Sequence, residues 1–110
     1  MTDIAASYAG AINAADLEAL LALFAPTAVL RNPFGEFSGI DEIRGFYTGT
    51  VLAGQTSLTV RSVERLDPRT VKAVLVASSP LGEPGNELLA VDEFQLDADG
   101  RIVALDITYP

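Results

Sequence analysis

The 110-residue chain contains no histidine, no cysteine and no tryptophan. Mechanisms that depend on an imidazole, on a thiolate or on a metal held by Cys and His are therefore excluded. The groups that remain for proton transfer are 15 carboxylates, three tyrosines and one lysine. Any acid–base chemistry in this protein must rest mainly on carboxyl and phenol groups.

Positive charge is also scarce, because seven basic residues face 15 acidic ones and give a net charge of −8. Such a chain repels phosphate backbones and anionic lipid, so we expect no nucleic-acid partner and no membrane association. No apolar run is long enough to span a bilayer, and residues 1–3 do not resemble a signal peptide, so we expect a cytoplasmic protein. The length and the absence of repeats or biased tracts predict one domain over residues 1–110.

The first half of the chain carries helical spacing. Ile4, Tyr8 and Ile12 recur at i, i+4 and i+8, which predicts an amphipathic helix with Tyr8 on its apolar stripe. A second helix is predicted over 17–24, with Asp16 as its N-cap and Pro26 as its stop.

A third helix is predicted after the capping signature at 38–41, from Ile40 to near Gly49. It places Tyr47 on its inner face, together with Ile43 and Phe46.

Two-residue periodicity predicts the strands. From Ala28 onward Leu30, Asn32 and Phe34 share one face, until the Asn32-Pro33 step disturbs the pattern. The later strands are predicted over 57–65, 70–77, 87–96 and 101–109. Turns at 66–69 and 97–100 and a loop at 81–86 connect them. Helices followed by strands predict an α+β fold in which the helices cover one face of a twisted sheet.

Asp92 lies on the apolar face of its strand, with Ala90 and Phe94. A carboxyl group on that face must find donors or raise its pKa and stay protonated, in which case it donates a hydrogen bond. The alternatives are that Asp92 points to solvent or pairs with an arginine.

Three other polar residues share apolar faces. Tyr8 and Tyr47 are either core tyrosines or phenol donors in a pocket. Asn32 either forms a turn with Pro33 or faces the same interior as Leu30.

Five segments, in order along the chain, form a joint pattern. They are Ser7-Tyr8-Ala9-Gly10-Ala11-Ile12-Asn13-Ala14-Ala15-Asp16-Leu17, Leu21-Ala22-Leu23-Phe24-Ala25, Asn32-Pro33-Phe34-Gly35, Ile43-Arg44-Gly45-Phe46-Tyr47 and Ala90-Val91-Asp92-Glu93-Phe94. Together these segments resemble the bacterial Δ5-3-ketosteroid isomerases. The resemblance runs over nearly the whole chain, and its most specific part is the joint placement of Tyr8, an Asn-Pro-Phe-Gly turn and Asp92.

The resemblance implies an NTF2-like, SnoaL-like cone: a curved, mostly antiparallel sheet around a deep pocket, with three helices in the N-terminal half. It also implies a steroid Δ-isomerase that needs no cofactor and works as a homodimer. Tyr8 and a protonated Asp92 would bind the carbonyl oxygen of a 3-ketosteroid or a phenolic analogue, and Tyr47 would support Tyr8. Apolar residues on both faces of the later strands agree with a dimer.

The sequence departs from this family at Asn32, where the family has an aspartate as the general base. An amide cannot take up a proton at neutral pH, so we expect ligand binding to persist and isomerisation to be strongly reduced. Asn32 belongs either to a natural relative that became a binder or to an engineered Asp→Asn variant, and the otherwise intact site favours the second.

Two further functions stay open. One is a non-catalytic binding protein for a steroid or another apolar ligand. The other is a different pocket enzyme, such as a polyketide cyclase or an epoxide hydrolase; the latter would need a further buried acid beside an arginine, and alternation turns Arg31 away from the Asn32 face.

Overall fold

The computed structural model describes residues 3–80 and 87–110. Helical segments and one six-stranded sheet make up this part of the chain. The helices are α1 (Ile4–Asn13), α2 (Leu17–Leu21), α3 (Ile40–Phe46) and a π-helix, η1 (Tyr47–Leu52). The strands are β1 (Phe24–Asn32), β2 (Gly35–Ser38), β3 (Ser57–Asp67), β4 (Thr70–Ser78), β5 (Leu88–Leu96) and β6 (Ile102–Thr108).

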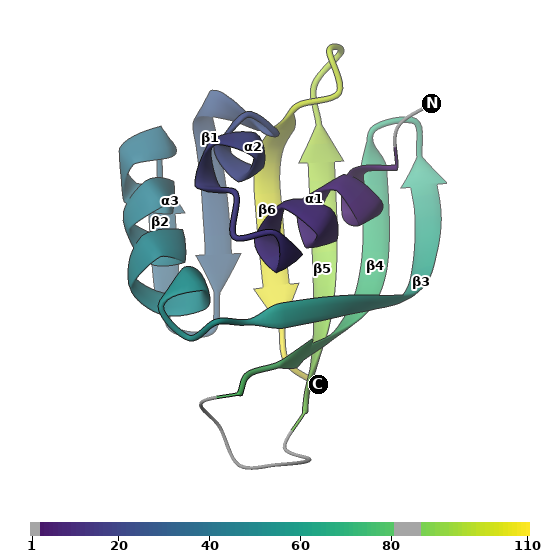
Figure 1. Cartoon of the computed structure of the whole chain (residues 1–110). Helices are drawn as coiled ribbons and strands as arrows, with labels where there is room; N and C mark the ends of the chain where they lie inside the picture. Colours follow the sequence, from purple (N-terminus) through teal and green to yellow (C-terminus); the bar gives the residue numbers. More distant parts are fainter. Residues whose placement is uncertain (1–2, 81–86) are drawn as a thin grey trace.

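The strands follow the order β2-β1-β6-β5-β4-β3 in a curved sheet. The pairing of β1 with β6 is parallel, and the other pairings are antiparallel. Helix α1 crosses one face of the sheet, and α3 lies beside β1 and β2 (Figure 1). The predicted α+β fold, with helices covering one face of a mostly antiparallel sheet, is confirmed.

Helix α1 supplies much of the interior on the covered face. Its stripe residues Ile4, Tyr8 and Ile12 are all buried, as their spacing predicts. The Asp3 side chain caps the helix by accepting a hydrogen bond from the backbone N–H of Ala5. This helix therefore forms where the sequence pattern places it.

The second helix is shorter than predicted. Asp16 is its N-cap, accepting from the N–H of Ala19, but the helix ends at Leu21 and Phe24 is the first residue of β1. Phe24 pairs with Ile102, whose N–H donates to the carbonyl of Leu23 at 2.8 Å. This apolar segment fits either structure locally, and pairing with a distant strand decides between them.

The chain around Asn32 also differs from the prediction. Strand β1 ends at Asn32, and a tight turn leads directly into β2, which the sequence did not predict. Phe34 lies in that turn and is 86% exposed, so it does not share an apolar face with Leu30. The turn breaks the alternation on which the prediction for Phe34 rested.

The third helix begins at Ile40 as predicted, but its cap is different. Gly39, with φ +85°, is the N-cap and provides no side-chain bond, while the Glu42 carboxylate accepts from the N–H of Ser38. The helical path does not stop near Gly49 but continues through η1 to Leu52.

The four later strands lie close to their predicted bounds. Asp97 closes the β5–β6 turn, where Gly100 adopts φ +83°. The loop predicted at 81–86 lies outside the described residues. Within the described residues, no helix has both the length and the apolar character needed to cross a membrane.

Candidate functional site

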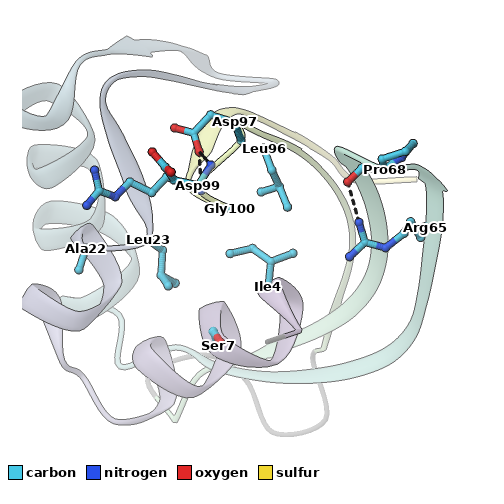
Figure 2. A pocket seen from close by; sticks show the side chains of 12 residues that line it. Ile4, Ser7, Ala22, Leu23, Arg65, Pro68, Leu96, Asp97, Asp99 and Gly100 are labelled. Atoms are coloured by element: carbon cyan, nitrogen blue, oxygen red, sulfur yellow. Dashed lines mark hydrogen bonds between the residues drawn. The ribbon is translucent and has the colours of Figure 1, made fainter. Parts of the chain in front are cut away.

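Two cavities open near the two ends of α1. The larger, about 530 Å³, lies near the start of this helix, and Ile4 and Leu96 point into it (Figure 2). Of the two aspartates that line it, Asp97 already accepts hydrogen bonds from the N–H groups of Asp99 and Arg101, both at 2.9 Å. Among the described residues, no buried polar side chain lines this cavity.

The smaller cavity, about 230 Å³, lies near the end of α1 and differs in its chemistry. Most of its walls are apolar, from α1, η1 and the faces of β4, β5 and β6 that α1 covers. Three of the sequence-predicted site residues line it, namely Tyr8, Asn32 and Asp92. The candidate site is therefore this cavity.

Asp92 is the buried acid of the site. It lies on β5 between Ala73 and Ile107 of the neighbouring strands and is only 3% exposed. Its Oδ1 atom has no hydrogen-bond partner among the described residues. Burial raises the pKa of Asp92 to about 7, so near neutral pH a large fraction of the group carries a proton. The two alternatives from the sequence, exposure to solvent and pairing with an arginine, are wrong.

Tyr8 and Tyr47 form a pair of buried phenols. Their hydroxyl oxygens lie 2.8 Å apart, and either group can be the donor. The Tyr8 ring also packs edge-on against Phe94, with ring centroids 5.3 Å apart. Burial raises the pKa of both hydroxyls above the usual value, so both keep their protons at neutral pH. With Tyr47 donating to Tyr8, the Tyr8 proton is available to a ligand.

Asn32 is held in the β1–β2 turn by its own side chain. Its Oδ1 accepts from the N–H of Phe34 at 2.8 Å and from that of Gly35 at 3.1 Å. The turn interpretation is confirmed, and the same residue also lines the cavity. Apart from Asp92, no carboxylate in the described part of the chain lines this cavity.

Arg31, on the same strand, points away from the cavity. It forms ion pairs with Glu36 at 3.6 Å and with Asp106 at 3.3 Å. The described residues therefore lack the buried acid and arginine pair that epoxide opening would need.

Tyr109 is a cavity residue that the sequence reasoning missed. It follows the end of β6, and burial together with the nearby charge of Asp92 raises its pKa. Alternation offered a signal, because Leu105, Ile107 and Tyr109 fall on one face of the strand.

This arrangement can bind an apolar molecule through one oxygen atom. Tyr8 and protonated Asp92 are donors in a water-poor environment, where hydrogen bonds to a negatively charged oxygen are strongest.

A model of the SnoaL-like domain matches residues 4–105. The chain belongs to the SnoaL-like domain family. The predicted SnoaL-like, NTF2-like superfamily is thereby confirmed.

Solved structures agree with this SnoaL-like fold. A candidate polyketide cyclase from Sinorhizobium meliloti is 24% identical, with a TM-score of 0.83, and the match covers 97% of this chain and 94% of that one. The protein RV0760c from Mycobacterium tuberculosis, solved with estradiol-17β-hemisuccinate, is 20% identical, with a TM-score of 0.82 and coverages of 94% and 88%. A candidate ketosteroid isomerase from Kribbella flavida is 18% identical, with a TM-score of 0.82 and coverages of 97% and 75%. At these identities the likeness shows the fold alone.

Proposed function

We propose that this SnoaL-like domain is a steroid Δ-isomerase scaffold that holds the oxygen of a 3-ketosteroid, or of a phenolic analogue, between Tyr8 and protonated Asp92. The observation that carries this proposal is the buried, unpartnered carboxyl oxygen of Asp92 in the same apolar cavity as the Tyr8 hydroxyl. An unpaired buried polar atom is costly, and a ligand oxygen would remove that cost. RV0760c, which has the same fold, was solved with a steroid ester.

The reaction moves a double bond from the β,γ to the α,β position of the ketone. A base at position 32 would take a proton from the carbon between the carbonyl and the double bond, which places negative charge on the carbonyl oxygen. Tyr8 and Asp92 donate to that oxygen, and the hydroxyl of Tyr47 lies 2.8 Å behind Tyr8 to support it. The base would then return that proton to the steroid two carbons away, so the reaction consumes no cofactor.

Asn32 occupies the position from which a base would act. Its Oδ1 is engaged by two backbone N–H groups, and an amide cannot accept the substrate proton. The chain therefore retains the oxygen-binding half of the site and lacks the base, as expected for a natural binder or for an engineered Asp→Asn variant.

The decisive experiment restores the base. Asn32→Asp keeps an oxygen acceptor for the turn, so the fold is preserved. We expect conversion of a β,γ-unsaturated 3-ketosteroid to its conjugated isomer to accelerate by roughly 10²–10⁴-fold, which is the usual contribution of a positioned base.

The matched control is Asn32→Asp combined with Tyr8→Phe, which keeps the base and removes one donor. This double variant should lose most of the gained rate. An Asn32→Asp protein that is no faster than the parent would rule out the isomerase assignment.

A second function, non-catalytic binding of an apolar ligand, is favoured by the engagement of Asn32 in the turn. In that case Asn32→Asp gains no rate, while the steroid still binds in the cavity. Tyr8→Phe then changes the affinity only modestly, through one hydrogen bond.

We also propose that a second copy of the chain covers the sheet face opposite α1. Val74 and Val91 pair across that face and are only half-buried, and the neighbouring Leu89 is 39% exposed. Sedimentation equilibrium at micromolar concentration should give twice the 11.6 kDa mass of the chain, and the mass of a single chain would refute the dimer.

A further inference from the structure

Phe34 is the most exposed large apolar residue in the described part of the chain. Its side chain is 86% exposed, although the residue also lines the cavity that contains Asp92. Its ring lies beside that of Tyr109, with centroids 6.3 Å apart and planes inclined by 44°. An exposed phenylalanine is costly in water, and here it lies where a molecule leaving the cavity would meet it.

The backbone under Phe34 is fixed rather than free. The Asn32 side chain accepts hydrogen bonds from the N–H groups of both Phe34 and Gly35. The turn joins two paired strands, with Asn32 opposite Gly35 in register. Phe34 is therefore presented to solvent by a defined turn, and removal of the Asn32 side chain would free it.

The size of the cavity indicates what Phe34 would contact. A volume of about 230 Å³ is smaller than the roughly 300–1,000 Å³ typical of sites that enclose a small molecule. Asp92 and Tyr8 are each only 3% exposed and form the inner end, whereas Phe34 forms the outer end. A ligand with several fused rings, bound by its oxygen at the inner end, must extend through the opening.

We propose that Phe34 and Tyr109 hold the outer rings of a multi-ring ligand between them, and that Asn32 is a positioning residue that holds Phe34 there. Phe34 then selects ligands by their length, and ligands with one ring escape this selection. This inference rests on the proposed function, because it takes the oxygen of the ligand to lie at Tyr8 and Asp92.

The experiment compares two phenols of different length, phenol itself and estradiol. Dissociation constants for both are measured with the parent and with Phe34→Ala, using Leu66→Ala as a control that removes an exposed apolar side chain outside the cavity lining. Phe34→Ala should weaken estradiol binding about tenfold, which is the effect of losing partial burial of one phenyl ring, and should leave phenol binding unchanged. Leu66→Ala should change neither value.

The role of Asn32 is tested by the ratio of the two dissociation constants. Asn32→Ala should change this ratio as Phe34→Ala does, because the turn loses its acceptor. Asn32→Asp should restore the parent ratio, since a carboxylate accepts the same two bonds and its charge acts on both phenols alike. A ratio that does not respond to Asn32→Ala overturns the positioning role.

Tyr8→Phe separates failure of this inference from failure of the proposed function. If Tyr8→Phe weakens both phenols while Phe34→Ala leaves their ratio at the parent value, the contact with Phe34 is wrong and the proposed function stands. If Tyr8→Phe changes neither affinity, the proposed function itself is wrong. Equal weakening of both phenols by Phe34→Ala would also overturn the selection by length.

Discussion

Asp92 and Asp97 are two carboxylates at two cavities, one within β5 and the other just beyond its end. Asp97 lies at the larger cavity, where two backbone N–H groups satisfy it. Asp92 lies at the smaller one, buried and with Oδ1 unpartnered among the described residues. Asp97 stabilises a turn, and Asp92 lowers stability unless a ligand occupies the site. The candidate site is therefore indicated by the unpartnered carboxyl group of Asp92 and not by the larger cavity volume.

The largest change in stability is expected for Asp92→Asn. Burial raises the folded-state pKa of Asp92 from 3.8 to about 7, so the folded protein binds the proton more tightly than the unfolded chain does. The contribution of this group to stability is therefore lost as the pH rises from about 4 to about 7, and amounts to about 4 kcal/mol. Asp92→Asn should remove this loss and be the more stable protein above pH ~7.

Urea unfolding of parent and variant at several pH values checks this prediction. Asp97→Asn is the matched control, because it removes the same charge and keeps an oxygen acceptor. A constant difference between parent and Asp92→Asn across the range would contradict the buried, neutral acid.

The second test is Asp97→Ala, which should lower the stability of the protein, whereas Asp92→Asn should raise it above pH ~7. The β5–β6 turn then loses the acceptor for the N–H groups of Asp99 and Arg101, and the free energy of unfolding should fall by about 2 kcal/mol. The affinity for estradiol should not change, because Asp97 does not line the smaller cavity. Weaker estradiol binding in this variant would show that the two cavities are coupled.

The smallest effect is expected for Tyr47→Phe. This change removes the hydrogen-bond partner of Tyr8 without changing the shape of the core, and should lower the free energy of unfolding by about 1 kcal/mol. The loss should be larger in the presence of estradiol, because Tyr8 without its Tyr47 donor binds the ligand oxygen less strongly. Thermal unfolding with and without estradiol measures both quantities, and an equal loss in the two conditions would argue against Tyr8 as a ligand contact.

Patterns that depend on local spacing predicted the fold and part of the site. The stripe of α1 placed Tyr8 inside, and the alternation of β5 placed Asp92 on the covered face, because each pattern reflects one buried surface. Asp16 was also predicted correctly as a cap, since its bond to Ala19 is local.

Features that depend on distant pairing were missed. Strand β2 is short and mostly exposed, so its sequence carries no clear alternation, and its pairing with β1 follows from the Asn32 turn. Phe24 belongs to β1 and not to the preceding helix because it pairs with Ile102, which is far away in the sequence. The partner of the Tyr8 hydroxyl was not missed, but it was predicted from the family resemblance and not from spacing, because Tyr47 reaches Tyr8 from another helix.

The parallel pairing of β1 with β6 has a consequence for how the protein folds. Phe24 lies opposite Ile102, so the sheet closes only when the last strand joins one of the first (Figure 1). Contacts between residues so distant in sequence slow folding, because the chain loses the entropy of a long loop before they form. During synthesis the strand that carries Asp92 leaves the ribosome before β6, and one edge of that strand lacks its backbone partner until β6 emerges.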